Sequence, residues 1–150
     1  ENKSKLFQMT KDILEQAYEE MKKNVTPKFN KNLSINIEKF SNGKYKSVSL
    51  DNGISVELEN GKYVSVESLS TGTIEQIYLA LRLSVIDELS PETLPIMLDE
   101  AFAYYDDERL AAALKFLNEI DNQVLIFTCT EREQEILNRN SIKYNLIKIN

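Results

Sequence analysis

The sequence predicts an α/β protein in which an antiparallel β-meander is followed by a mostly parallel sheet flanked by helices. Two observations carry this prediction. Apolar and polar residues alternate between residues 33 and 68, as they do in strands that bury one face. Beyond residue 72, short apolar runs alternate with longer stretches of helical period, which is typical of parallel strands covered by helices on both sides.

The chain opens with a predicted helix over residues 5–23. Its apolar residues, among them Leu6, Met9 and Ile13, recur every three or four positions. We expect the helix to end at Thr26, because the ring of Pro27 disfavours helical geometry at the residue before it.

The meander follows this helix. Its four predicted strands cover residues 33–40, 44–50, 54–59 and 62–67, and the pairs Asn42-Gly43, Asn52-Gly53 and Asn60-Gly61 separate them. Such pairs favour the positive φ angles of tight hairpins. The α/β part is predicted as a buried helix after Gly72, a strand at 96–98, a helix at 107–120, a strand at 124–127, a helix at 131–139 and a last strand at 144–149.

The amino-acid composition excludes several classes of function. The 150 residues are 42% hydrophobic and 28% charged, which fits one globular domain. No apolar run reaches the length of a membrane span, and the single Cys129 fits a reducing compartment, so we expect a cytoplasmic protein. The chain has no histidine, which excludes imidazole bases, and its four glycines cannot form a G-x-x-x-x-G-K-[ST] phosphate loop.

Charge is unevenly distributed along the chain. The net charge is -6, yet residues 22–46 hold seven lysines and one acidic residue, whereas residues 51–121 hold fifteen acidic and four basic residues. The lysine-rich segment could attract a nucleic-acid backbone, and the acidic part would repel one.

Three segments carry candidate chemistry. In the first, LSTGTIEQ, Gly72 lets the backbone approach a ligand, Ser70 adds a hydroxyl, and the following helix offers unpaired N–H groups to an anion. The structural alternative is a strand-to-helix turn in which Thr73 and Gln76 form a capping box.

The second segment, LPIMLDEA, ends a buried strand in Asp99 and Glu100, at the sheet edge where α/β proteins bind ligands. One carboxylate could hold Mg²⁺ through water while the next polarises an attacking water. The alternative is a solvated acidic loop. In the third segment, AFAYYDDERL, Asp106 lies seven residues beyond Asp99, although an acidic run that opens a helix is also expected from capping alone.

In this order, the three segments resemble the signature motif, Walker B motif and D-loop of ABC ATPases. Their residues are most similar to those of SMC-like proteins of the YhaN-type and RecF-like repair branch. The resemblance covers residues 24–150, and it includes the run from Thr73 to Gln76 into Ala80-Leu81-Arg82-Leu83. It implies that residues 25–150 are the C-terminal half of an ATPase head and that residues 1–24 form the base of a coiled-coil arm.

The resemblance also implies roles for single residues. The nucleotide-binding set would be Leu69, Ser70, Thr71, Gly72, Thr73 and Gln76, with Ser70 and Gly72 contacting the γ-phosphate of ATP held by a second head. Asp99 would position Mg²⁺, Glu100 would activate water, and Asp106 would communicate across the dimer. The implied partners are an N-terminal Walker A lobe, a second head in an ATP-sandwiched dimer, and DNA.

Thr130 departs from the family pattern, because it stands where the family has a switch histidine. A threonine donates a hydrogen bond but carries no charge. We expect the isolated chain to be inactive, and two alternatives remain open. One is a non-catalytic, nucleotide-dependent dimerisation or clamp module. The other is a metal nuclease built on Asp99, Glu100, Asp106 and Asp107.

Overall fold

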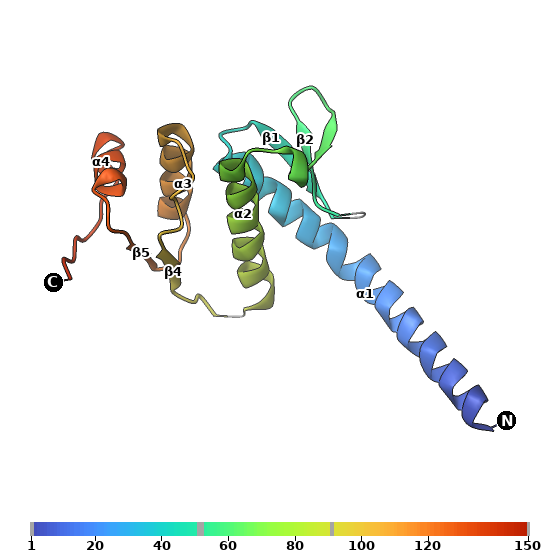
Figure 1. The fold of residues 1–150 in the computed structure, drawn as a ribbon. Coiled ribbons are helices and arrows are strands. Elements are labelled where there is room, and N and C mark those ends of the chain that lie inside the picture. Colours follow the sequence, from blue (N-terminus) through green and yellow to red (C-terminus); the bar gives the residue numbers. More distant parts are fainter. Residues whose placement is uncertain (1, 51–52, 91, 150) are drawn as a thin grey trace.

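The structure is a computed structural model, and it describes residues 2–50, 53–90 and 92–149, with the side chains of 2–4, 21–26, 28 and 89 left out of the description. A long helix projects from a body in which three helices stand side by side (Figure 1). The elements are α1 (Asn2–Phe40), β1 (Tyr45–Ser49), β2 (Ser55–Leu58), β3 (Tyr63–Ser65), a 3-10 turn (Val66–Ser68), α2 (Thr71–Leu89), β4 (Ile96–Asp99), α3 (Asp107–Glu119), β5 (Val124–Phe127) and α4 (Arg132–Arg139).

Helix α1 is much longer than the sequence predicts, so the predicted end at Thr26 and the predicted strand at 33–40 are both wrong. Pro27 lies inside the helix. Leu33, Ile37 and Phe40 are fully buried, whereas Ile35 is 45% exposed. The buried spacing of four and three residues is helical, and the apparent alternation of Leu33, Ile35 and Ile37 also fits a strand. Tertiary packing decides between helix and strand. The ring centroid of Phe40 lies 4.5 Å from that of Phe116 on α3.

The pair Asn42-Gly43 ends α1 instead of joining two strands. Asn42 has a φ of 53° and Gly43 a φ of 83°. The Gly43 amide donates to the Glu38 carbonyl at 2.7 Å, and the Asn42 amide donates to the Lys39 carbonyl at 3.2 Å. These two bonds are those of a Schellman motif, which satisfies the last carbonyls of a helix. The turn sends the chain back along α1 into β1.

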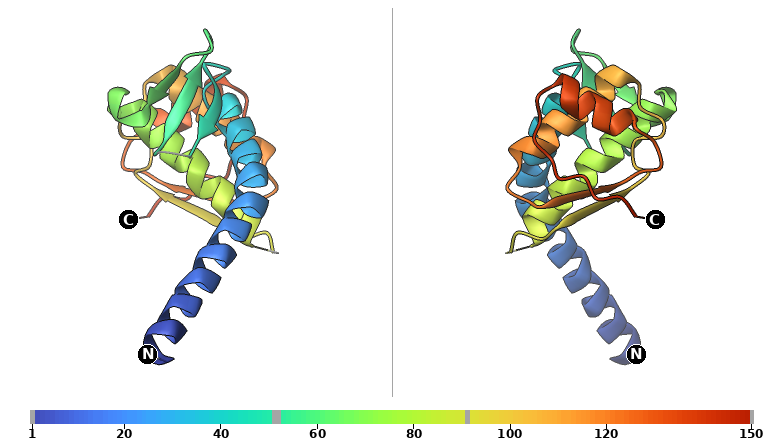
Figure 2. Two further views of the ribbon diagram at one scale, coloured as in Figure 1. Left: turned by 90° about the vertical axis from the view of Figure 1, so that its right-hand side faces the viewer. Right: turned by 90° about the vertical axis from the view of Figure 1, so that its left-hand side faces the viewer.

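The remaining part of the meander is confirmed. Strand β1 pairs with β2 and β2 with β3, both antiparallel, in the order β1-β2-β3. The turn between β2 and β3 contains Gly61, with a φ of 76°, as expected for an Asn-Gly hairpin. Gly53 also has a positive φ, of 98°, while Asn52 lies outside the described residues. Strand β1 packs on α1, so the meander covers the buried end of the long helix (Figure 2).

Helix α2 is the buried helix that the sequence predicts. Ile77, Leu79, Ala80 and Leu83 belong to the core cluster that α1 and α3 also line. A polar contact joins α2 to α1, because the Asn36 amide donates to the Ser84 hydroxyl at 2.8 Å. This bond fixes the second half of α2 against α1.

The second sheet is smaller than predicted. Strands β4 and β5 are parallel, and Ile96, Met97, Leu98 and Asp99 pair in register with Val124, Leu125, Ile126 and Phe127. The predicted strand at 144–149 is wrong, since this segment has no regular structure. Ile147 and Ile149 are 77% and 80% exposed, and an extended segment needs a neighbouring strand to satisfy its backbone. None of the helices in the described ranges is sufficiently long and apolar to cross a membrane.

Candidate functional site

Two carboxylates stand at the carboxyl edge of the parallel strands, as predicted. Asp99 is the last residue of β4 and is paired in register with Phe127, the last residue of β5. Asp99 and Glu100 are both exposed. Within the described part of the chain, the Asp99 carboxylate makes no hydrogen bond or ion pair. It is therefore available to a ligand at this edge.

Glu100 is held in a tight turn directly after β4. Its φ of 46° is unusual for a residue with a side chain. The Glu100 amide donates to the Phe127 carbonyl at 2.9 Å, and its carboxylate accepts a 2.6 Å bond from the Cys129 amide. The carboxylate also raises the pKa of the exposed Cys129 thiol, by hydrogen bonding first and by charge second. The backbone of Glu100 is thus tied to the end of β5 and its carboxylate to the loop that follows.

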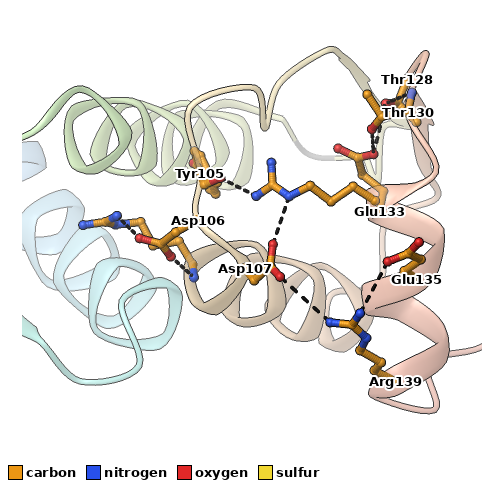
Figure 3. A network of polar contacts seen from close by, with 10 residues as sticks. Tyr105, Asp106, Asp107, Thr128, Thr130, Glu133, Glu135 and Arg139 are labelled. Atoms are coloured by element: carbon orange, nitrogen blue, oxygen red, sulfur yellow. Dashed lines mark hydrogen bonds and ion pairs between the residues drawn. The ribbon is translucent and has the colours of Figure 1, made fainter.

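Thr130 lies in that loop, but its hydroxyl has a partner inside the chain. It donates to Glu133 on α4 at 2.7 Å, and the Thr128 hydroxyl donates to the same carboxylate oxygen at 3.0 Å. The Thr130 amide in turn donates to the Thr128 hydroxyl at 3.1 Å. Figure 3 shows the two threonines facing Glu133, which is only 7% exposed. A hydroxyl has one hydrogen to donate, so Thr130 offers none to a phosphate while this bond persists.

The signature-like segment, residues 69–76, opens helix α2. Ser70 is the N-cap residue, and its carbonyl accepts from the amides of Thr73 and Ile74, both at 2.9 Å. Ser70 and Thr71 are exposed, and Leu69 is half-buried. The Ser70 hydroxyl lies 2.9 Å from the hydroxyl of Thr73, which is 2% exposed. The exposed part of the segment is thus its first turn, where helix N–H groups favour an anion.

Gly72 is required by a contact within the chain. It is buried, and a Cβ atom placed on it would lie 2.3 Å from the Tyr104 carbonyl oxygen. Any larger residue would therefore push α2 away from the loop between β4 and α3. This close approach brings the signature-like segment against the loop that leads from Glu100 to Asp106.

Asp106 is joined to the same segment through a residue that the sequence analysis does not single out, Arg109. Asp106 caps α3, accepting from the Arg109 amide at 2.8 Å, and its other carboxylate oxygen pairs with the Arg109 guanidinium. The guanidinium also donates to the Thr73 hydroxyl at 3.2 Å. The third position of a helix lies within reach of its N-cap, which is the sequence signal that could have pointed to Arg109.

The capping-box alternative is wrong for Thr73 and Gln76. The helix begins at Thr71, so Thr73 lies inside its first turn. Gln76 is 1% exposed and its amide donates to the Phe40 carbonyl at the end of α1. Gln76 therefore holds two helices together inside the protein, at a distance from the exposed turn.

The nuclease alternative is not supported by the geometry. Asp106 pairs with Arg109, while Asp107 pairs with Arg132 at 3.1 Å and with Arg139 at 3.9 Å. Figure 3 shows Asp106 and Asp107 turned to different neighbours. In the described ranges, no three acidic or cysteine side chains gather in a way that could hold a metal ion. The four carboxylates are thus divided between separate surroundings.

The chain is similar to proteins of known sequence and known structure. No family model matches the chain. It is 29% identical to the uncharacterized protein YhaN of Bacillus subtilis strain 168 over 143 aligned residues, with 91% of this chain but only 15% of YhaN covered. It is similar to an SMC ATPase solved in work on ATP-driven dimerization and DNA-stimulated activation, at 18% identity and a TM-score of 0.59, with 72% of this chain and 71% of that chain covered.

A second solved structure is similar over a larger share of this chain. The Smc head domain of Pyrococcus furiosus, with an extended coiled coil and bound to the C-terminal domain of ScpA, is similar at 20% identity and a TM-score of 0.59. The likeness covers 89% of this chain and 37% of that one. The chain has the fold of the C-terminal part of an SMC-type ATPase head. This fold confirms the predicted α/β class and, at the level of the fold, the resemblance to SMC-like ATPase heads.

Proposed function

We propose that the chain is the C-terminal half of an SMC-like ATPase head, which binds and hydrolyses ATP with Mg²⁺ at the interface with a second head. The observation that carries this proposal is the presence of two distinct polar surfaces. One is the sheet edge with Asp99 and Glu100, and the other is the exposed first turn of α2 with Ser70. A nucleotide sandwiched between two heads needs one surface of each kind from different heads.

The sheet edge is the hydrolytic surface in this proposal. Glu100 is the general base, because its carboxylate is fixed by the Cys129 amide and directed by the turn after β4. The Asp99 carboxylate, which has no partner within the described residues, holds Mg²⁺. A single protein carboxylate suits this ion, since Mg²⁺ usually keeps several waters and takes the remaining ligands from substrate phosphates. Mg²⁺ held there would neutralise charge at the phosphates.

The first turn of α2 is the surface that faces the nucleotide of the opposite head. We assign the γ-phosphate contact to Ser70 and the adjacent amides, with Leu69, Thr71, Gly72 and Thr73 shaping the turn. Asp106 lies beside this turn, and in this proposal it communicates across the interface between the two heads. The Walker A loop must come from the complementary lobe, because no glycine-rich phosphate loop occurs in this sequence.

The clamp alternative is favoured by one observation. The Thr130 hydroxyl is committed to Glu133, and it occupies the place of the family's switch histidine. A head without a free donor at this position would hold nucleotide and turn it over slowly. The two functions differ in the hydrolysis rate alone, and both need the dimer.

The proposal also couples ATP hydrolysis to DNA repair or chromosome maintenance. Helix α1 projects from the body, as an arm would, and residues 2–24 form its distal part (Figure 2). Leu6, Phe7 and Ile13 on this part are 65%, 77% and 61% exposed. Such apolar side chains suit a second helix packed alongside.

Glu100→Gln tests the ATPase proposal in the head completed by its Walker A lobe. We expect hydrolysis to fall by about 10²–10⁴-fold with nucleotide binding retained, because the change removes a base and leaves the site's shape intact. The Mg-ATP complex of this variant should accumulate as a dimer that light scattering detects.

The chain by itself serves as a control and should neither hydrolyse ATP nor bind it at micromolar concentration. Unchanged hydrolysis by Glu100→Gln would move the base to another residue. A completed wild-type head that forms ATP-dependent dimers without turnover would support the clamp function instead.

A further inference from the structure

The hydroxyl of Thr73 is a buried junction between three side chains. Arg109 of α3 donates to it at 3.2 Å, and Tyr45 of β1 donates to it at 3.5 Å. The Ser70 hydroxyl lies 2.9 Å away on its other side. Thr73 is 2% exposed and Tyr45 is 3% exposed, so water does not compete freely for these hydrogen bonds.

One arrangement of the hydrogens satisfies this junction when Arg109 and Tyr45 both donate to Thr73. A guanidinium can only donate, and a threonine hydroxyl has one hydrogen and two acceptor sites. With its acceptor sites facing Arg109 and Tyr45, Thr73 directs its own hydrogen to the Ser70 oxygen. Ser70 accepts this bond in that arrangement, and because Ser70 is exposed its own hydrogen is then available to a group outside the chain.

Arg109 is itself held firmly. Its backbone amide and its guanidinium both bond to Asp106, which caps the same helix. Its side chain is 24% exposed, although it carries a full charge. A planar guanidinium that bonds a carboxylate and a hydroxyl at once fixes the distance between them. The position of Asp106 is thus transmitted to Thr73.

We infer that Arg109 is a positioning residue which, through Thr73, orients the Ser70 hydroxyl as an outward hydrogen-bond donor and couples it to Asp106. The inference rests on the proposed function, in which that donor meets the γ-phosphate of the opposite head. A shift of Asp106 on dimerisation would move Arg109 and so change the strength of the bond from Ser70 to the phosphate. The sensing residue and the phosphate-binding residue of one head would then act as a unit.

A double-mutant cycle tests this coupling. The readout is the dissociation constant of the ATP-bound dimer of the completed head, measured by sedimentation in the Glu100→Gln background. Arg109→Gln should weaken the dimer about tenfold, the effect expected from removing one hydrogen bond to a charged group. In a Ser70→Ala head the same Arg109→Gln change should have almost no further effect, because the hydroxyl that it orients is gone.

The outcomes separate the inference from the proposed function. Equal effects of Arg109→Gln with and without the Ser70 hydroxyl would overturn the inference, because Arg109 would then act on packing or through its charge alone. If Ser70→Ala leaves the dimer unchanged, the signature assignment fails, and the inference fails with it. If Ser70→Ala weakens the dimer and the two changes are not additive, both stand.

Further variants keep the test independent of folding. Arg109→Lys retains the charge but removes the fork that reaches Asp106 and Thr73, so it should resemble Arg109→Gln. Thr73→Val should weaken the dimer equally and Thr73→Ser should restore most of the affinity, because only the serine keeps the hydroxyl. Arg139→Gln removes an exposed arginine that pairs with Asp107 and Glu135, and it provides the matched control for the removal of a positive charge on a neighbouring helix.

Thermal unfolding of each variant completes the test. A dimer weakened in Arg109→Gln without any change in unfolding temperature supports positioning. If affinity instead fell in proportion to unfolding temperature in all the variants, including Arg139→Gln, the effect would be structural and the inference would be overturned.

Discussion

At the level of single residues, hydrogen bonds inside the chain decide which polar groups remain for a ligand. Thr130 and Gln76 both belong to the predicted site, yet Thr130 donates to Glu133 and Gln76 to Phe40. Ser70 and Asp99 remain exposed. The roles that the sequence assigns to Ser70 and Asp99 stay predictions that their surroundings permit.

Ser70→Arg is the sharpest test of the phosphate-binding role. The residue is exposed at the helix N-cap, so we expect little change in stability, within the roughly 1 kcal/mol that a changed cap costs. The long side chain should nevertheless abolish ATP-dependent dimerisation of the completed Glu100→Gln head, by filling the space that the phosphate needs. Sedimentation with and without ATP measures this, and equal dimer yields in both heads would remove the signature assignment.

Cys129 reports on Glu100 without any nucleotide. The Glu100 carboxylate raises the pKa of the thiol, and the thiolate is the reactive form. Glu100→Gln should therefore lower this pKa, enlarge the thiolate fraction near pH 7.5 and speed alkylation by iodoacetamide severalfold. The difference should vanish above the raised pKa, where both thiols are ionised. Equal rates near pH 7.5 in the folded proteins, measured by mass spectrometry, would show that Glu100 leaves the loop in solution.

At the level of elements, the second half of α1 depends on its partners. Residues 33–40 carry a pattern that fits a strand or a helix, and Pro27 disfavours the helix. The packing of Leu33, Ile37 and Phe40 in the core outweighs that cost. The meander and α2 are thereby assembled on a rigid helix that continues into the projecting arm.

A pair of alanine substitutions distinguishes helix from strand in this segment. Leu33→Ala should lower the free energy of unfolding by about 2–5 kcal/mol, because it empties a fully buried site. Ile35→Ala should change it by less than about 0.5 kcal/mol, since Ile35 is 45% exposed and alanine favours a helix. Urea unfolding measures both. In a strand, Leu33 and Ile35 would share one face, and the two substitutions would then cost similar amounts.

At the level of the whole molecule, charge is distributed between two regions. Lys31, Lys44 and Lys46 are exposed near the buried end of α1. Glu38 pairs with Lys46 at 2.9 Å and raises its pKa. Lys22, Lys23 and Lys28 belong to the same lysine-rich segment but lie outside the described side chains. The acidic residues beyond position 51 include Asp99, Glu100 and Asp106 of the proposed nucleotide surfaces.

Charge reversal tests whether this region binds DNA. Changing Lys28, Lys31, Lys44 and Lys46 to glutamate should weaken DNA binding by the full protein. It should also lower the salt dependence by about 0.9 in log–log slope for each phosphate that the protein no longer neutralises. Reversal of Lys143 and Lys148, near the far end of the chain, is the matched control. DNA affinity that is unchanged by the first set would mean that these lysines only solvate the surface.

The sequence by itself determined the fold class, five helices and strands after residue 70, most of the meander and the carboxylates at the sheet edge. These features follow from local rules: apolar period, Asn-Gly turns and the position of acidic residues after an apolar strand. Such rules act within a few residues, so they can be applied without knowing which distant segments pack alongside.

Only the tertiary structure decided the length of α1, the lack of regular structure in residues 144–149 and the link from Asp106 through Arg109 to Ser70. Each depends on a partner distant in sequence: Phe116 for the end of α1, a pairing strand for 144–149, and Thr73 for Arg109. The physical reason is the same in all three. Burial and buried hydrogen bonds contribute more free energy than local preference, and they form only when distant segments meet.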